Sequence, residues 1–348
     1  MIAKALKRIT KDWFLAGMIL AVVLATLFPE VGSTGGLIHA DKLSDWGIFA
    51  IFFLHGLGLS TERMWTGMSR WKLHVVVQLM TFVVFPLFWV VLNLIFGNML
   101  PKPLMLGFFY LCAVPSTISS SVALTGVAKG NVPGAIFNAT LSSLIGVFAT
   151  PFLASLVVQG GQGSIPLGHA IVEIAELLLL PFVIGQALRP ILGRWFEKHR
   201  KTINPFDKCV ILLLVFSSFC DSVKSGLWTN YGAETLVVAL IGAAVILTLA
   251  LLTTTNTTKW LGFDRGDHIA AVMCGSKKSL AGGVPMAKLL FVGNPAIGLI
   301  VLPLMFYHQL QLFVCSILAE RYAKSAPQEA SPQEENRRLP EANGVAAN

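Results

Sequence analysis

Long apolar segments separated by short polar ones recur along the chain and predict its organisation. A bilayer core of roughly 30 Å is crossed by about 20 mostly apolar helical residues. On that basis the sequence predicts an all-α polytopic protein with ten membrane spans, of which the first is retained rather than removed as a signal peptide. The longest internal loop is expected from Arg189 to Lys208. The spans are expected, within several residues at each end, at 12–29, 44–59, 73–96, 104–126, 132–158, 168–190, 208–223, 234–254, 267–291 and 295–320.

Two of these spans, the fourth and the ninth, are interrupted by residues that suit a lipid-facing helix poorly. The fourth contains Pro115 followed by a run of hydroxyl residues, and the ninth contains Lys277, Lys278, three glycines and Pro285. Charge at bilayer depth is expensive, and broken backbone is tolerated there only where protein or a cavity satisfies it. Paired broken helices in matching positions of two halves indicate a transporter's substrate site.

Composition supports a membrane protein and argues against a nucleic-acid partner. The 348 residues are 55% hydrophobic and 13% charged, against about 25% charged in globular proteins. The net charge is +8, but the basic residues are scattered between apolar segments, which is typical of topology determinants. The five cysteines match neither a disulfide framework nor a metal site.

The distribution of positive charge supports ten spans with both termini in the cytoplasm. Of the 26 Lys and Arg residues, 20 fall in segments on the cytoplasmic side and three lie within the ninth span. Only Lys42, Lys102 and Lys224 fall in outside loops. The cytoplasmic ends are then residues 1–11 and a tail, 324–348, which is expected to be disordered because it has few large apolar residues.

Ten spans divide into two repeats of five, at about 12–158 and 168–320, within a membrane domain of residues 12–323. An odd number of spans per repeat places the two repeats in opposite orientations, which predicts an inverted repeat. A weak sequence repeat between the two halves agrees with this division. Gly130-Asn131 follows the first broken span and Gly293-Asn294 follows the second, at an offset of 163 residues.

Hydroxyl and amide side chains in the first half are candidates for binding an ion or substrate. Hydroxyls and freed carbonyls beside Pro115 make an oxygen cage of the kind that a dehydrated sodium ion needs, although Ser and Thr also bond to their own helix or pack helices together. The amide of Gln78 is either a ligand or a link between helices. The candidates are Gln78, Ser116, Thr117, Ser119, Ser120, Ser121, Asn138 and Thr140.

The ninth span suggests an anion site. Gly282 and Gly283 are expected to form its break, with Pro285 in the first turn of a second half-helix, whose N-terminus favours negative charge. Lys277 and Lys278 add positive charge, which indicates an anionic substrate or a proton-linked lysine. In the alternative, one lysine pairs with Glu173 or Glu176 of the sixth span and the other extends to the interface.

Three classes of function remain. A secondary transporter of an organic anion is favoured, a membrane regulator of another ion pathway is the alternative, and an intramembrane enzyme ranks lowest. No catalytic residue is assigned, because the sequence contains no H-E-x-x-H, G-x-S-x-G or phosphate-loop motif.

Four segments resemble the bile acid:sodium symporter superfamily, and especially its bacterial SBF-like (YfeH-type) branch. The resemblance covers about residues 10–325 and is most specific at 51–62, 78–86, 115–131 and 275–279, the last of which includes Ser279. It implies ten helices in an inverted repeat, divided into a panel and a core in which helices four and nine unwind and cross. It also implies symport by alternating access in the inner membrane of a bacterium, with Na⁺ as the coupling ion, whereas the buried lysines suggest H⁺ instead.

The resemblance also implies a sodium site. In well-studied symporters of the superfamily, ligands come from helices three, four, five and nine. Carried over, Ser120 and Ser121 take the place of a Ser-Asn pair, Gln78 matches a glutamine of helix three, and Asn138 and Thr140 stand near the helix-five hydroxyls. The carboxylate of helix nine has no counterpart here, because a lysine pair stands in that region. Sodium coupling and bile acid as substrate are therefore in question.

Overall fold

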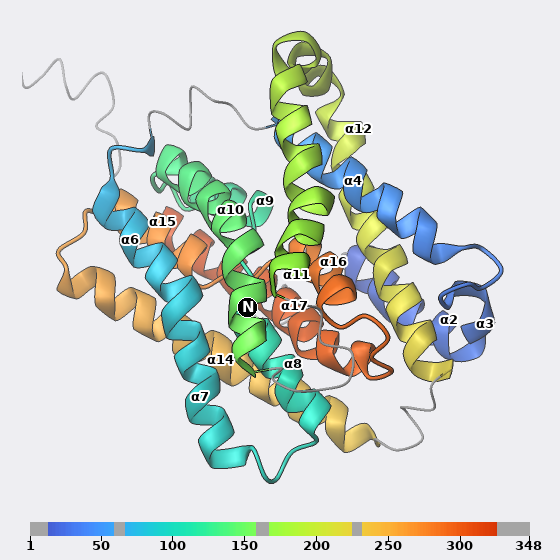
Figure 1. The fold of residues 1–348 in the computed structure, drawn as a ribbon. Helices are drawn as coiled ribbons and strands as arrows, with labels where there is room; N and C mark the ends of the chain where they lie inside the picture. Colours follow the sequence, from blue (N-terminus) through green and yellow to red (C-terminus); the bar gives the residue numbers. More distant parts are fainter. Residues whose placement is uncertain (1–12, 59–66, 158–166, 225–231, 326–348) are drawn as a thin grey trace, which may run out of the picture.

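The computed structural model describes residues 13–58, 67–157, 167–224 and 232–325, and all the regular elements in these ranges are helical (Figure 1). The predicted N-terminal segment 1–11 lies outside the described residues. So do Ser60 to Glu62 of the resembling motif and the part of the predicted tail after Ser325.

Helices occupy all ten predicted ranges, and the fourth and ninth are each divided in two as the sequence predicts. A short helix, α3, was not foreseen. The bounds are α2 Trp13–Leu27, α3 Pro29–Gly32, α4 Ala40–Gly58, α6 Trp71–Leu79, α7 Phe85–Phe96, α8 Lys102–Ala113, α9 Ser119–Val127, α10 Val132–Val157, α11 Leu167–Ile174, α12 Leu180–Lys224, α14 Ala233–Trp260, α15 Arg265–Gly275, α16 Leu280–Leu290 and α17 Ile297–Lys324. Two π-helical turns, η1 Met80–Val84 and η2 Ala175–Leu179, join α6 to α7 and α11 to α12.

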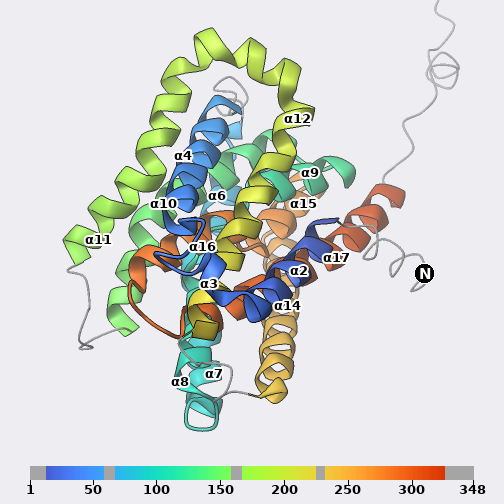
Figure 2. The same cartoon turned by 90° about the vertical axis from the view of Figure 1, so that its right-hand side faces the viewer.

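The predicted loop from Arg189 to Lys208 is wrong, because helix α12 runs through it without interruption. Pro190 and Pro205 lie inside this helix. A proline removes one helical hydrogen bond and bends the axis at that point, so a helix with two prolines turns without unwinding. Figure 2 shows that α12 forms an arch, whose first limb continues α11 and η2 through the sixth predicted span and whose second limb supplies the seventh.

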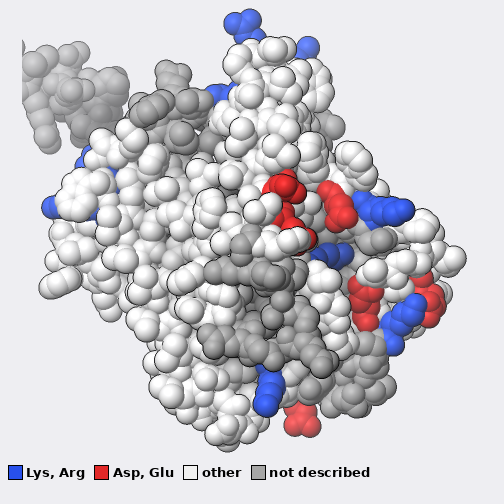
Figure 3. Space-filling model, viewed as in Figure 1, with Lys and Arg blue, Asp and Glu red and all other residues white. Residues whose placement is uncertain are grey.

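The surface is that of a membrane protein. Five helical stretches are long and apolar enough to cross a bilayer, and α2 and α8 are apolar but shorter. Many large apolar side chains are exposed, among them Leu94, which is 79% exposed, and Val237, at 54%. Figure 3 shows a face that is mostly uncharged, with Lys and Arg side chains at the tip of the α12 arch. Exposed apolar area on this scale is compatible with lipid as the surrounding solvent.

The helices pack in two groups. In the first, α12 packs against α2, α3 and α4, and in the second, α17 packs against α8, α9 and α14 while α15 packs against α6, α9, α10 and α14. Backbones come very close within the first group, because a Cβ atom on Gly56 would overlap the carbonyl of Phe182 and one on Gly185 would overlap that of Phe53. The groups meet where α12 packs on α16 and α17 and where α10 packs on α11.

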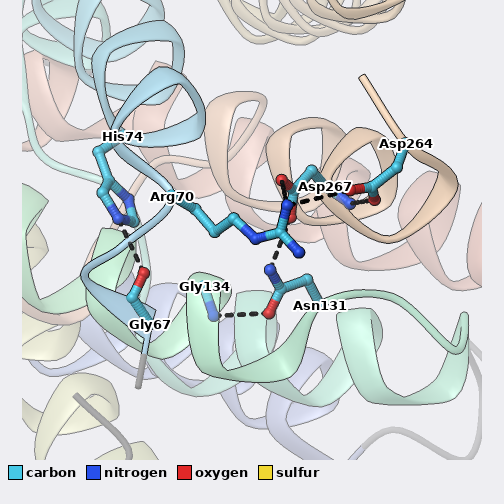
Figure 4. Close-up of polar contacts among 7 residues, drawn as sticks. All are labelled: Gly67, Arg70, His74, Asn131, Gly134, Asp264 and Asp267. Carbon is cyan, nitrogen blue, oxygen red and sulfur yellow. Dashed lines mark hydrogen bonds and ion pairs between the residues drawn. The ribbon is translucent and has the colours of Figure 1, made fainter. Parts of the chain in front are cut away.

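A polar network ties the ends of α6, α10 and α15 together (Figure 4). Arg70 lies 3.4 Å from a carboxylate oxygen of Asp264 and 3.6 Å from one of Asp267. Asp264 accepts a hydrogen bond from the backbone N of Asp267 and so caps α15, while Asn131 accepts one from Gly134 at the start of α10. The amide of Asn131 also donates to Asp267 at 2.6 Å. The network fixes where α15 begins. It thereby also fixes the position of the C-terminal end of α15, at Gly275, where the ninth predicted span is interrupted.

Candidate functional site at the crossing of two broken helices

The first break separates α8 from α9. Helix α8 ends at Ala113, and residues 114–118 are not helical, because Pro115 has no N–H and disfavours a helical conformation at Val114. Helix α10 provides the missing partners. Ser116 N donates to Ser142 Oγ at 3.0 Å, and Thr150 Oγ1 donates to the carbonyl of Ala113 at 3.0 Å. The break at Pro115 is thus confirmed.

The second break separates α15 from α16 and lies at Ser276–Ser279, not at Gly282-Gly283 as predicted. The Ser279 side chain accepts a hydrogen bond from Gly282 N at 3.0 Å and caps α16, so helix begins before the glycines. Gly283 instead allows close packing, because a Cβ atom there would lie 2.5 Å from Leu304 Cδ2. Pro285 lies inside the helix.

The two breaks are bonded to each other. Ser279 N donates to the carbonyl of Pro115 at 2.8 Å, and Ser116 Oγ donates to the carbonyl of Cys274 at 2.7 Å. The half-helices therefore cross at their interruptions. The C-terminal ends of α8 and α15 and the N-terminal ends of α9 and α16 meet in one buried place.

Lys278 is the centre of this crossing. Its side chain is fully buried, and Nζ donates to the carbonyl oxygens of Thr81 at 2.8 Å, Cys112 at 2.8 Å and Val114 at 2.9 Å. The ring centroid of Phe85 lies 4.1 Å from Nζ. Three acceptors around one nitrogen match the three donors of an ammonium group, and the ring adds a cation–π contact.

Two prolines leave these carbonyl groups without their usual helical donors. In η1 the N–H of Phe85 bonds to Met80, and Pro86 has no N–H, so Thr81 O is left over. Cys112 O would pair with Ser116 N in a regular helix, but that N–H donates to Ser142, and Val114 lies in the extended region. Lys278 therefore satisfies groups that the helix interruptions expose, at the negative end of the α8 dipole.

Lys277 is equally buried but differs in its contacts. Its Nζ bonds no nitrogen or oxygen atom within the described ranges, and its polar neighbours are the thiols of Cys315, which is close enough for a weak side-chain hydrogen bond, and Cys274. The alternative pairing with Glu173 or Glu176 is wrong. Glu173 lies 3.2 Å from His169, and the three protons of Lys278 all go to carbonyl groups.

Three of the five predicted hydroxyl residues are hydrogen-bonded to one another around the start of α9. Thr117 Oγ1 lies 2.7 Å from Ser120 Oγ and 3.1 Å from Ser121 Oγ, while Ser116 is bonded across the crossing. Ser121 interacts with the Cys274 thiol, so the cluster reaches the end of α15, where the second break begins. Ser119 is exposed and does not face this cluster.

Of the remaining predicted residues, Gln78 and Asn138 bond each other across two helices, whereas Thr140 bonds only its own helix. Gln78 Nε2 donates to the backbone carbonyl of Asn138 at 3.2 Å and lies 3.4 Å from its Oδ1, whereas Gln78 Oε1 is buried without a partner among the described residues. Asn138 Nδ2 donates to Gly134 O. Thr140 bonds the carbonyl of Ile136 in its own helix. Gln78 and Asn138 thus join α6 to α10, and Thr140 is not directed at the crossing.

A bound sodium ion does not fit the charge of this arrangement. The oxygens of Ser120, Ser121 and Gln78 are present, but no carboxylate bonds to either lysine in the described part of the chain. The segment that would supply the anionic ligand supplies two lysines instead. In a low-dielectric interior a further cation beside an ammonium group, without a counter-charge, is strongly disfavoured.

Three residues at the site were missed in the sequence. Gln311 Oε1 accepts from Lys278 N and its Nε2 donates to Lys278 O, both at 2.8 Å, and Tyr307 donates to Ser276 O at 2.6 Å. Tyr110 donates to the carbonyl of Gly283. The signal was available, because Gln311 is an amide in an apolar span, as Gln78 is.

Half-helices that cross inside a bundle of apolar helices are typical of membrane transporters. Residues 12–324 match the family model described as the SBF-like CPA transporter family. The chain belongs to this family.

Several relatives match over nearly their whole length. The uncharacterized protein PA2026 of Pseudomonas aeruginosa is 43% identical over 91% of this chain and 94% of its own. YfeH of Escherichia coli (strain K12), which is provisionally named a symporter, is 39% identical over 93% of this chain and 96% of its own. Sodium/bile acid cotransporter 7-B of Xenopus laevis is 33% identical over 90% and 92%.

Proposed function

We propose that this protein is a secondary transporter that moves a small organic anion across the membrane by alternating access. The observation that carries the proposal is the crossing itself, where Ser279 N bonds to Pro115 O and Ser116 Oγ to Cys274 O. Broken helices that meet at bilayer depth form substrate sites because their free ends present backbone groups that a continuous helix hides.

The ends that meet at the crossing favour an anion. Helices α9 and α16 direct their N-termini toward it, and a helix N-terminus attracts negative charge. Lys277 adds a buried amine that bonds no nitrogen or oxygen atom in the described ranges. A bile acid, which appears in the name of the Xenopus laevis relative, is one member of the substrate class to be tested.

The proposed architecture is a ten-span inverted repeat of two five-helix halves. In its support, α10 bonds the break of its own half through Ser142, and α17 bonds the break of the other half through Tyr307 and Gln311. Ser116 and Ser279 are 163 residues apart, as are the two Gly-Asn pairs. We further propose that both termini lie in the cytoplasm, as the distribution of Lys and Arg predicts, and that the membrane is the inner membrane of a bacterium.

Flux through the purified protein tests the proposal. Proteoliposomes are loaded with buffer, and uptake of a panel of labelled anions, bile acids and shorter carboxylates among them, is compared with uptake by protein-free liposomes. We expect saturable uptake of at least one anion, which unlabelled substrate competes away. Monodisperse, correctly folded protein that moves no member of the panel would contradict transport and favour the regulatory alternative.

A further inference from the structure

We infer that the ammonium group of Lys278 is a tethered cation, which holds the helix crossing together in place of a bound metal ion, so that neither the crossing nor transport requires sodium. The second half of this inference rests on the proposed transport function. The first half concerns the structure alone and is tested without flux.

The contacts of Lys278 Nζ fill every bonding direction of an ammonium group. One direction is the covalent stem, and the other three hold the carbonyl oxygens of Thr81, Cys112 and Val114 at 2.8–2.9 Å. A neutral amine has only two N–H donors and would leave its lone pair facing a carbonyl oxygen. Three carbonyl acceptors therefore favour the ammonium form of Lys278 over the neutral amine. A metal ion could reach these oxygens only by displacing the ammonium group.

The position of Lys278 connects three elements that a bound cation would otherwise have to connect. The acceptors belong to η1 and to the end of α8, while the lysine belongs to the break after α15. Because the side chain is part of the chain, the amine is always present at the crossing and its effective concentration does not depend on the salt in the solution. A dissociable ion would hold the same elements only at sufficient concentration.

A second cation at the crossing would need a negative charge beside it, and none of the groups bonded to Lys278 Nζ in the described part of the chain supplies one. Lys277 is adjacent, and no carboxylate bonds to either lysine within the described residues. A bound anion would then balance the positive charge of Lys278 at the crossing. This agrees with the sequence, in which a lysine pair stands in the region where the resemblance implies a carboxylate ligand.

Thermal unfolding of the purified protein in detergent provides the first test. Midpoints are compared in sodium, potassium and choline chloride at equal ionic strength, for the unmutated chain and for Lys278→Ala. The unmutated chain is expected to unfold at the same temperature in all three salts. Lys278→Ala is expected to unfold on the order of 5 °C lower or more, and added ethylammonium, which fits the vacated space, should recover part of that loss.

Lys288→Ala is the matched control. Lys288 lies in α16 and donates to a side-chain hydroxyl, Ser217 Oγ, at 3.1 Å. Its midpoint should not respond to ethylammonium. A sodium-dependent midpoint in the unmutated chain overturns the inference, as does a Lys278→Ala protein that is as stable as its parent. If Lys278→Ala cannot be purified, the sodium comparison on the unmutated chain decides alone.

Flux separates this inference from the proposed function. Uptake that collapses when choline replaces sodium on both sides would overturn the tethered cation and leave transport standing. A sodium-independent midpoint, a Lys278→Ala protein rescued by ethylammonium and no uptake of any anion would leave the tethered cation standing and remove transport. Uptake at an equal rate in sodium and choline supports both.

Discussion

A single amide of Gln311 bonds both backbone polar groups of Lys278, since Oε1 accepts from the backbone N and Nε2 donates to the carbonyl, each at 2.8 Å. The pairing is of the kind that a neighbouring β-strand would offer, and it lets Lys278 be non-helical in the interior at no loss of hydrogen bonds. Gln311 thereby fixes the backbone from which the Lys278 side chain reaches its three carbonyl groups.

Replacing Gln311 should weaken the fold substantially. Gln311→Leu keeps the size of the side chain but leaves a buried N–H and a buried C=O without partners, at about 1–3 kcal/mol each. We expect a loss of roughly 2–5 kcal/mol, measured as the free energy of unfolding in a denaturant series. Gln309→Leu is the control, because Gln309 contacts the sulfur of Met18 and no backbone group at the break. Equal losses for the two variants would contradict the role of Gln311.

Lys277 and Lys278 should respond in opposite ways to replacement by Met. Lys278→Met removes three charge-assisted hydrogen bonds, whereas Lys277→Met removes a buried amine that bonds no nitrogen or oxygen atom among the described residues. Lys277→Met is therefore expected to be as stable as the parent or more stable, by on the order of 1 kcal/mol.

The same Lys277→Met protein should lose anion uptake by about tenfold or more, because the substitution removes a buried amine from the crossing, where the N-termini of α9 and α16 meet. Unfolding and uptake are measured on one preparation of each variant. A Lys277→Met protein with parental uptake would show that this amine takes no part in anion binding, whatever its stability.

The hydroxyl cluster of α9 is expected to matter more for uptake than for stability. Ser120→Ala with Ser121→Ala removes two oxygens that meet Thr117 beside the crossing, and it leaves only small cavities. Uptake or anion affinity should fall by about tenfold while unfolding changes by less than roughly 1 kcal/mol. Ser119→Ala, at an exposed position on the same helix, should behave as the parent does. Parental uptake in the double variant would assign the cluster to helix packing.

The sequence predicts those features of the fold that depend on local hydrophobicity or on a single proline. The ten helical ranges follow from apolar length, and the break of the fourth helix follows from Pro115, whose missing N–H acts where it stands. The loop at 189–208 was wrong because Pro190 and Pro205 bend a helix whose neighbours remain helical, and this depends on the packing of α12 against α2, α3 and α4. A proline alone does not distinguish a bend from an end.

The site was predicted less well, because it is assembled from distant carbonyl groups. The break of the ninth helix was placed at Gly282, since glycine is a strong local signal, but Ser279 caps α16 before it. That Lys278 bonds Thr81, Cys112 and Val114 depends on the crossing of helices far apart in the chain. Residue types predict that two lysines are important at this depth, and only the fold distinguishes the partnered lysine from the unpartnered one.

The native thiol of Cys209 offers a direct test of topology. Cys209 is exposed, whereas Cys112, Cys220, Cys274 and Cys315 are buried. It follows Lys208 at the start of the seventh predicted span, which the charge distribution places at the cytoplasmic side. A membrane-impermeant maleimide should therefore label the unmutated protein in inside-out vesicles but not in intact spheroplasts, and Cys209→Ser should abolish the label.

In that Cys209→Ser background Lys102→Cys, at an exposed position at the start of α8, should show the reverse pattern. Labelling of Cys209 from outside would contradict both the cytoplasmic termini and the ten-span arrangement.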